Sequence, residues 1–314
     1  MPAVADSLND QPRRPSGRFA LRRHYGVQLA GAAVLALIGV LAGCDSFPPN
    51  TPDKPDIPAP PQAQAPDYAE VAAGYNANAG RIDRLWARAV VISRWTDEDG
   101  GTHAEQGEGH FMFIKPSRVA LSAGKLGKTL FWAGANDELF YIFNLTSDPK
   151  KVYYGRYADL GALRMSQIVL PVAPADLLML VGVNPLPVAE PAGGHVEHFA
   201  GGKLLVETPD RRWRLLIDPK THLPERIDML DAAGQSVLTC RLADFDRIDV
   251  AAALGPFMAT SIHIQAVGED GELDLRLNAM TDARDTNRLR DMAFDFDALV
   301  RALQPDEQVE LKPQ

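Results

Sequence analysis

Cysteine is scarce in this chain, because its 314 residues contain only Cys44 and Cys240. Cys240 lies within the stretch SVLTCRLADF, whose apolar residues indicate a strand. A cysteine in such a stretch is usually a small buried side chain, so we do not expect a catalytic thiol there. If Cys44 is modified, Cys240 has no partner for a disulfide.

Positive charge is also in short supply. The whole chain has a formal net charge of −9. Residues 1–43 hold five of the 32 basic residues and two of the 41 acidic ones, so the remaining 271 residues carry 27 basic and 39 acidic side chains, a net charge of −12. Such a chain is not expected to bind nucleic acid or an anionic lipid surface through charge.

Motifs typical of enzymes are missing or incomplete. The sequence has no Gly-x-Ser-x-Gly elbow. Residues 122–129, SAGKLGKT, resemble a phosphate-binding loop, but Ser122 replaces its first glycine and the following LFWAGAND predicts a strand where a helix is needed. His195 and His198 flank Glu197 without a third well-spaced ligand, so we expect solvated histidines. We therefore predict no enzymatic activity, no bound metal and no cofactor.

The first 44 residues divide into a basic, an apolar and a small-residue segment. Five arginines between residues 13 and 23 precede an uncharged run, residues 25–42, that leads into Gly43 and Cys44. This is the order of a secretory signal. An uncleaved transmembrane helix is the alternative, because roughly 18 apolar residues just suffice to span a bilayer.

The sequence Leu41-Ala42-Gly43-Cys44 resembles the lipobox of bacterial lipoproteins. The resemblance implies that residues 1–43 are a signal peptide, that Cys44 is acylated, and that the protein faces the periplasm from a membrane of the cell envelope. Asp45 resembles the inner-membrane retention signal of enteric bacteria. That rule differs between bacterial groups, so the choice between inner and outer membrane stays open.

A proline-rich segment separates Cys44 from the rest of the chain. Residues 45–66 contain eight of the 24 prolines. This composition cannot bury a core and favours an extended conformation of roughly 3.1 Å per residue. We expect residues 44–66 to be a disordered tether that reaches up to about 70 Å.

After residue 66 the sequence predicts one α+β domain. Asp67 and Glu70 indicate a helix start, and apolar residues recur at helical spacing up to Trp86. Short alternating stretches with Gly, Pro and Asp turns then predict antiparallel strands, interrupted by a helix over residues 171–182, and MAFDFDAL near the end predicts a closing strand. The expected fold is a single strongly curved antiparallel sheet, an incomplete barrel, whose concave face is covered by the long N-terminal helix and the inserted helix.

Residues 212–235, RWRLLIDPKTHLPERIDMLDAAGQ, resemble the paired strands of LolA/LolB-type carriers of outer-membrane lipoproteins. The resemblance spans residues 67–300, which we predict to be the domain, with residues 301–314 as a C-terminal tail. It implies a half-barrel with its mouth lidded by helices and an apolar cavity for acyl chains. Residues that alternate along the strands are candidates to line this cavity, although a place in a filled core is the more common role for any one of them: Val91, Phe111, Phe113, Phe131, Phe140, Ile142, Leu215 and Ile217.

Two functions fit these observations. The first is a membrane-anchored envelope lipoprotein that holds a lipid or a lipoprotein acyl chain in its cavity and takes part in lipoprotein or lipid transport. The second is a non-catalytic scaffold with a filled core, which binds another envelope protein through the surface or edge of the sheet.

Overall fold

The structure is a computed structural model that describes residues 64–96, 101–156, 159, 176–188, 193–250, 254–268, 271–282 and 291–312. All of these residues belong to one compact unit, residues 61–314. The predicted signal peptide, Cys44 and most of the predicted tether lie outside the described residues.

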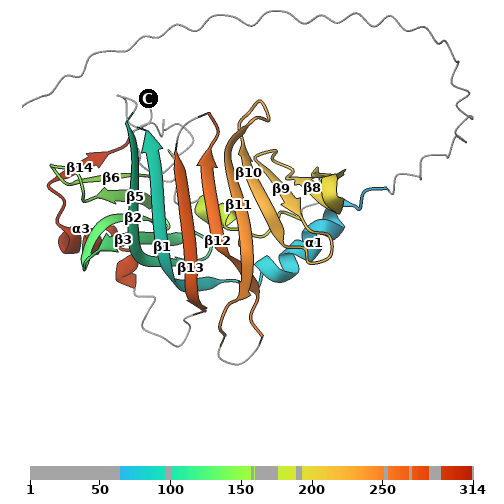
Figure 1. The fold of residues 1–314 in the computed structure, drawn as a ribbon, viewed down its shortest axis with the longest axis horizontal. Helices are drawn as coiled ribbons and strands as arrows, with labels where there is room; N and C mark the ends of the chain where they lie inside the picture. Colours follow the sequence, from blue (N-terminus) through green and yellow to red (C-terminus); the bar gives the residue numbers. More distant parts are fainter. Residues whose placement is uncertain are drawn as a thin grey trace, which may run out of the picture. The chain divides into compact units, whose positions relative to one another are not determined.

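Fourteen strands of the described residues form one sheet (Figure 1). Its order is β14-β6-β5-β4-β3-β2-β1-β13-β12-β11-β10-β9-β8-β7. Neighbouring strands are antiparallel except β14 and β6. The strands are β1 (Arg84–Thr96), β2 (Thr102–Ile114), β3 (Arg118–Lys125), β4 (Lys128–Ala135), β5 (Leu139–Asn144), β6 (Lys151–Arg156), β7 (His195–Phe199), β8 (Lys203–Glu207), β9 (Trp213–Ile217), β10 (Pro224–Leu230), β11 (Ser236–Arg247), β12 (Phe257–Ala266), β13 (Glu272–Thr281) and β14 (Glu307–Glu310). The predicted fold class, a large curved antiparallel sheet that does not close, is confirmed.

The two predicted series of strands meet at the centre of this sheet. β1 pairs with β2 on one side and with β13 on the other. The pairing brings the first strand of the domain beside the last strand of the second series, so β1–β6 and β7–β13 form one continuous surface (Figure 1). Residues that alternate along these strands therefore share one inner face across both halves.

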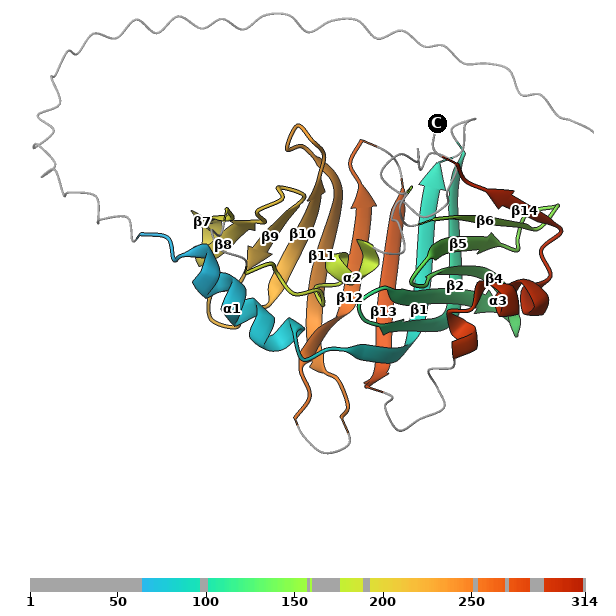
Figure 2. The same ribbon diagram turned by 180° about the vertical axis from the view of Figure 1, so that it is seen from behind.

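Helices α1 (Tyr68–Ala79) and α2 (Leu177–Leu180) lie on the inner face of the sheet (Figure 2). Tyr68, Val71 and Tyr75 of α1 and all four residues of α2 belong to the main hydrophobic core, together with the inward residues of both strand series. α2 falls within the predicted inserted helix, of which residues 171–175 lie outside the described part. The two predicted helices therefore cover the concave face of the sheet, as expected.

α1 is shorter than predicted. It ends at Ala79 with Gly80 as its C-cap, and β1 begins at Arg84. Leu85 and Trp86 were expected on the helix, but in β1 they point to opposite faces, since Leu85 joins the main core and Trp86 joins a second cluster. Alternation along a strand accounts for their burial, and the helical spacing that includes them is coincidental.

Polar contacts fix α1 at its C-terminal end. Asn76 donates to the carbonyl of Leu186 (2.8 Å) and accepts from its N–H (2.7 Å). The Lys115 ammonium donates to the carbonyl of Ala79 (2.9 Å) and to that of Val183 (2.5 Å). Burial lowers the pKa of Lys115 to about 8. This one side chain links β2 to the end of α1 and to the segment that follows α2.

The last helix packs on the opposite, outer face of the sheet. α3 (Phe296–Leu303) contacts a cluster around Tyr141 and Phe143, the outward residues of β5. MAFDFDAL was predicted to be a strand, and that prediction is wrong. The Asp295 carboxylate accepts the N–H of Ala298 (2.9 Å) and caps the helix. The apolar residues that follow recur at helical spacing: Phe296, Leu299, Val300 and Leu303.

The predicted tail also contributes to the sheet. Residues 301–314 contain the end of α3 and strand β14, which pairs in parallel with β6 from Glu307 opposite Lys151 to Glu310 opposite Tyr154. The Lys150 N–H donates to the Asp306 carboxylate (2.9 Å) just before this pairing begins. In the structure the sheet therefore extends to residue 310, beyond the predicted domain end at residue 300.

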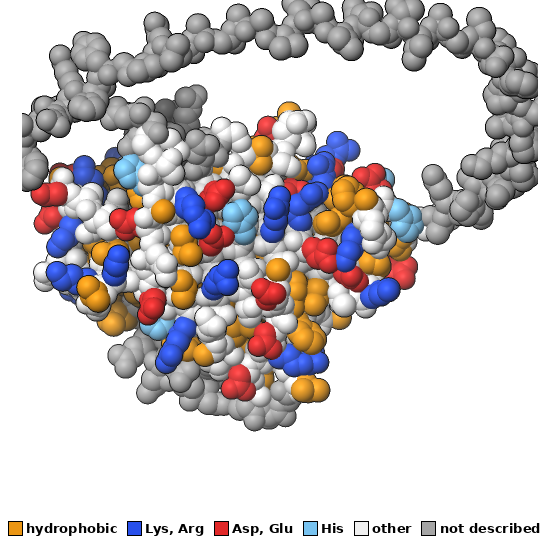
Figure 3. All heavy atoms as spheres, viewed as in Figure 1, with side chains coloured by type: hydrophobic (Ala, Val, Ile, Leu, Met, Phe, Trp, Pro, Cys, Tyr) orange, Lys and Arg blue, Asp and Glu red, His pale blue; other side chains and the backbone are white. Residues whose placement is uncertain are grey.

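Charges of both signs are interspersed on the outer face, which Figure 3 shows. Ion pairs cross neighbouring strands between Arg94 and Asp274 (2.6 Å) and between Arg214 and Glu207 (3.1 Å). Exposed pairs of this kind each stabilise a protein only slightly. Because positive and negative side chains alternate in this way, the outer face has no large patch of a single charge sign in the part that Figure 3 shows.

The stretch that carries the family resemblance folds as predicted. β9 leads into a turn at Asp218, β10 follows, and a second turn begins at Asp231. One Asp218 oxygen accepts the N–H groups of Lys220 (2.8 Å) and Thr221 (3.2 Å), and the other lies 2.8 Å from the Lys203 ammonium. The Lys203 contact, followed by the backbone contacts, lowers the pKa of Asp218 to about 2.

This turn predicts a pH-dependent stability difference for Asp218→Asn. A carboxyl group whose pKa is lower in the folded state stabilises the fold above its unfolded pKa near 4, and this stabilisation disappears as the pH falls towards 2. The free energy of unfolding of the wild type should therefore exceed that of the variant at pH 6, and the difference should shrink between pH 4 and pH 2. Urea denaturation over this pH series measures it.

Asp231→Asn is the matched control for this prediction. Asp231 accepts turn N–H groups from Ala233 (2.8 Å) and Gln235 (2.9 Å), but no lysine or arginine of the described residues pairs with it. The difference in the free energy of unfolding between Asp231→Asn and the wild type should change less over the same pH range than the difference for Asp218→Asn. An Asp218→Asn difference that stays constant from pH 6 to pH 2 would contradict the prediction.

Candidate functional site

A cavity of about 270 Å³ opens on the inner face, lined by residues of β1–β6 and β13. Its lining is mostly apolar. Among the described residues, none of α1 or α2 lines it, and the lid of helices over its mouth stays a prediction. The lining residues are Val91, Ser93, Trp95, Glu105, Gln106, Gly107, Ala123, Leu130, Phe131, Ile142, Asn144, Thr146, Tyr153 and Leu273.

Small residues form the floor of this cavity. Val91 of β1 lies opposite Gly107 of β2, and two residues further along β2, Gly109 lies opposite Ala123 of β3. Further still along β2, the inward positions are filled by the buried rings of Phe111 and Phe113. The inner face is therefore filled at one end of β2 and hollow at the other.

Larger apolar side chains form the wall. The pairing places Ala133 of β4 beside Ile142 of β5 and Tyr153 of β6. Phe131 is the next inward residue of β4, and like Tyr153 it is only partly buried. Partly buried aromatic side chains beside a hollow provide apolar surface that a ligand could cover.

Polar groups and one stacked ring pair lie at the rim. Trp95 of β1 stacks on His103 of β2 with ring centroids 5.3 Å apart and an interplanar angle of 18°. Glu105 is exposed and faces Ser93 across the same two strands. Asn144 accepts from the N–H (3.1 Å) and the hydroxyl (2.7 Å) of Thr146, which fixes the turn after β5.

The structure separates the eight predicted cavity residues into two groups. Val91, Phe131 and Ile142 line the cavity. The other five are fully buried in the main core: Phe111, Phe113, Phe140, Leu215 and Ile217. Cys44, the predicted acylation site, lies outside the described residues.

Several lining residues were not predicted, above all Trp95, Glu105 and Tyr153. Each shares the inward alternation of a predicted residue on the same or a neighbouring strand. The signal that could have located the cavity is the absence of bulk at Gly107 and Ala123. Alternation identifies a face of a sheet, whereas small residues identify where that face is hollow.

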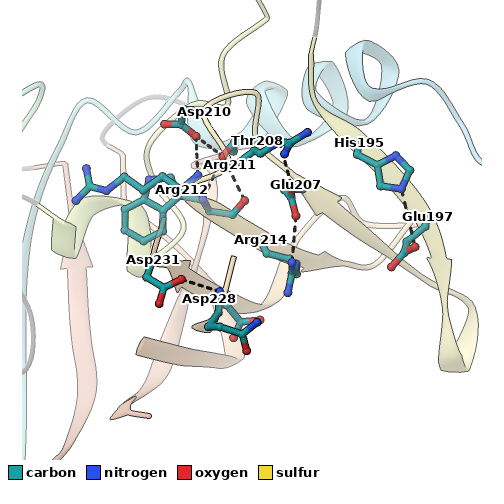
Figure 4. Close-up of polar contacts among 12 residues, drawn as sticks. His195, Glu197, Glu207, Thr208, Asp210, Arg211, Arg212, Arg214, Asp228 and Asp231 are labelled. Carbon is teal, nitrogen blue, oxygen red and sulfur yellow. Dashed lines mark hydrogen bonds and ion pairs between the residues drawn. The ribbon is translucent and has the colours of Figure 1, made fainter. Parts of the chain in front are cut away.

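The histidine pair of HVEHF lies on the edge strand β7 (Figure 4). His195 and Glu197 are 3.9 Å apart and both side chains are largely exposed. In the described part of the chain, no three His, Cys, Asp or Glu residues gather closely enough to hold a metal ion. Nothing in this geometry indicates a metal centre on β7.

Two other features of the sequence have structural roles. Cys240 is fully buried, and burial raises the pKa of its thiol, which keeps the sulfur protonated and unreactive. Lys128 begins β4, directly after the turn at Gly127, so a strand follows the loop that resembles a phosphate-binding motif. The helices that the structure describes are too short or too polar to span a bilayer.

No protein-family model matches the sequence, and no curated protein matches it either. Solved structures are similar to it in fold. A DUF1329 family protein from Desulfovibrio piger is 11% identical, with 74% of this chain and 97% of that chain covered and a TM-score of 0.49. A putative outer membrane lipoprotein-sorting protein domain from Vibrio parahaemolyticus is 11% identical, with 72% and 98% covered and a TM-score of 0.48.

A LolA superfamily protein from Nitrosomonas europaea is 12% identical, with 74% of this chain and 99% of that chain covered and a TM-score of 0.44. At such identities and TM-scores, the similarity does not transfer a ligand or a partner to this chain.

Proposed function

We propose that this protein is an acyl-anchored envelope protein that binds the apolar chain of a lipid or a lipoprotein in the cavity on the inner face. The observation that carries the proposal is the hollow between the small floor residues Gly107 and Ala123 and the partly buried wall residues Phe131 and Tyr153. A well-packed interior leaves few such voids, because each one forgoes dispersion contacts.

Binding in this cavity would be passive. Removing apolar surface from water yields about 25 cal/mol per Å², and the wall side chains offer such surface. The size of the cavity, about 270 Å³, is at the small end of ligand pockets. It suits part of one acyl chain better than a whole lipid, with the rest of the molecule outside the mouth.

The cell-envelope location and the membrane anchor rest on the first 66 residues. A basic segment, an apolar run and Leu-Ala-Gly-Cys precede a tether rich in proline. An acylated Cys44 would hold the domain at the membrane surface, and the tether would let it reach ligands or partners at a distance. Transport of lipids or lipoproteins is the role that combines anchor, tether and cavity.

The test is native mass spectrometry of the mature chain, residues 44–314, produced without the leader and with Cys44→Ser. We expect a population heavier than the polypeptide by the mass of an apolar molecule, which disappears under denaturing conditions. Protein that is folded and free of ligand, both as purified and after incubation with fatty acids and phospholipids, would contradict the proposal.

The scaffold function is favoured by a different surface. On the outer face, ion pairs join β8 to β9 and β13 to β1, and no helix of the described residues packs over β8–β13. A protein partner could use this polar surface without any ligand in the cavity. The same mass spectra distinguish the two functions, because a scaffold retains no apolar molecule.

A further inference from the structure

We propose that the ligand of the cavity carries a cationic head, an ammonium group, at the end of its apolar chain. This inference rests on the proposed function and adds a class of ligand to it. Glu105 is the one charged residue among the described residues that line the cavity. No ion pair or hydrogen bond to the Glu105 carboxylate exists among the described side chains, so this rim charge has no partner in the part of the chain that the structure describes.

Aromatic side chains surround the same space. Trp95, Phe131 and Tyr153 all line the cavity with Glu105. The negative face of an aromatic ring attracts a cation, most strongly for Trp, and quaternary ammonium groups are bound in this way. Stacking on His103 holds the Trp95 ring at the rim and restricts its rotation. A carboxylate and several aromatic rings that line one cavity are the chemistry that recognises a substituted ammonium group.

Basic residues near the cavity do not favour an anionic head. Lys151 of β6 lies opposite Asn144, but its ammonium group is 3.1 Å from the Glu307 carboxylate of β14. Neither Lys nor Arg is among the lining residues. The net charge of −12 on the chain after residue 43 also attracts cations and repels anions.

The test compares three probes that share a dodecyl chain and differ in the head: dodecyltrimethylammonium, dodecyl maltoside and dodecyl sulfate. Each is titrated below its micelle concentration into the mature chain with Cys44→Ser. We expect the cationic probe to bind about tenfold more tightly than the neutral one and the anionic probe to bind most weakly. Glu105→Gln should remove most of the preference for the cation, measured as the ratio of the affinities for the cationic and the neutral probe.

Glu108→Gln is the matched control. Glu108 lies on the same strand, three residues further on, and its side chain belongs to the outer face. This variant loses the same charge from the whole molecule and should keep the preference for the cationic probe. Equal losses in Glu105→Gln and Glu108→Gln would reduce the effect to net charge and overturn the inference.

Two further outcomes separate this inference from the proposed function. If all three probes bind equally, or if the sulfate binds best, the cationic head is wrong and the apolar cavity stands. If none of the three binds to folded protein, the proposed function fails, and the inference fails with it.

Discussion

Replacing Cys44 with alanine is expected to abolish lipid attachment and to leave residues 1–43 on the chain. A lipobox cysteine receives its diacylglyceryl group on the thiol before the signal peptide is removed, and alanine has no sulfur to accept it. The variant should therefore incorporate no radiolabelled fatty acid when it is made in bacteria. Its intact mass should equal the full 314-residue polypeptide.

Cys240→Ala is the matched control, because it removes the only other sulfhydryl group of the chain. Cys240 is fully buried in β11, so its loss leaves the leader and the lipobox untouched. This variant should be labelled and processed like the wild type. Labelling of Cys44→Ala would place the acyl group on another residue and contradict the assignment of Cys44. Wild-type protein that is unlabelled and retains residues 1–43 would favour the transmembrane alternative and remove the acyl anchor from the proposed function.

The fold class could be predicted from the sequence because strand alternation and turn residues are local signals. Each predicted strand of the two series is found, and the turns at Asp218 and Asp231 form where the sequence places them. The pairing of β1 with β13 could not be predicted from local signals. It joins residues that are far apart in the chain, and no local sequence pattern indicates such a pairing.

The two errors in which a helix and a strand were exchanged have one cause. Around Phe294 and Phe296 the sequence satisfies strand alternation, and from Phe296 to Leu303 it also satisfies the helical period. The Asp295 side chain caps the N-terminus of α3 and favours the helix over the strand. At the end of α1 the same ambiguity has the opposite outcome, since Leu85 and Trp86 fit a helix in the sequence and belong to a strand in the structure.

The cavity could be predicted only in part. Inward alternation selected Val91, Phe131 and Ile142 together with five residues that fill the core. Which inward residues stay uncovered depends on where α1 and α2 pack, and that is a property of the assembled domain. Both helices belong to the core that spans the sheet, yet neither reaches the end of β1 and β2 where the cavity opens.

Filling the cavity by Ala123→Phe is expected to abolish binding of apolar chains while the domain stays folded. Ala123 lines the cavity and its Cα pairs with that of Phe131, so a new ring at this position enters the hollow beside the existing one. Added bulk in a filled core costs typically about 1–3 kcal/mol, and here the empty space should reduce this cost. Binding of dodecyl maltoside, measured by calorimetry, should weaken by more than about tenfold, which corresponds to about 1.4 kcal/mol.

Ala243→Phe makes the same change on the other side of the sheet. Ala243 is exposed in β11 and pairs with Ser261 on the outer face, so its new ring cannot reach the cavity. This variant should bind dodecyl maltoside like the wild type, and both variants should show a cooperative urea transition. If Ala123→Phe is folded and still binds with wild-type affinity, the chain is held elsewhere and the hollow at Gly107 and Ala123 is not the binding site. If Ala243→Phe also loses binding, an added aromatic ring disturbs the whole sheet. The smaller substitution Ala123→Leu then distinguishes a filled cavity from a disturbed sheet. It fills less of the cavity and should weaken binding by an intermediate amount.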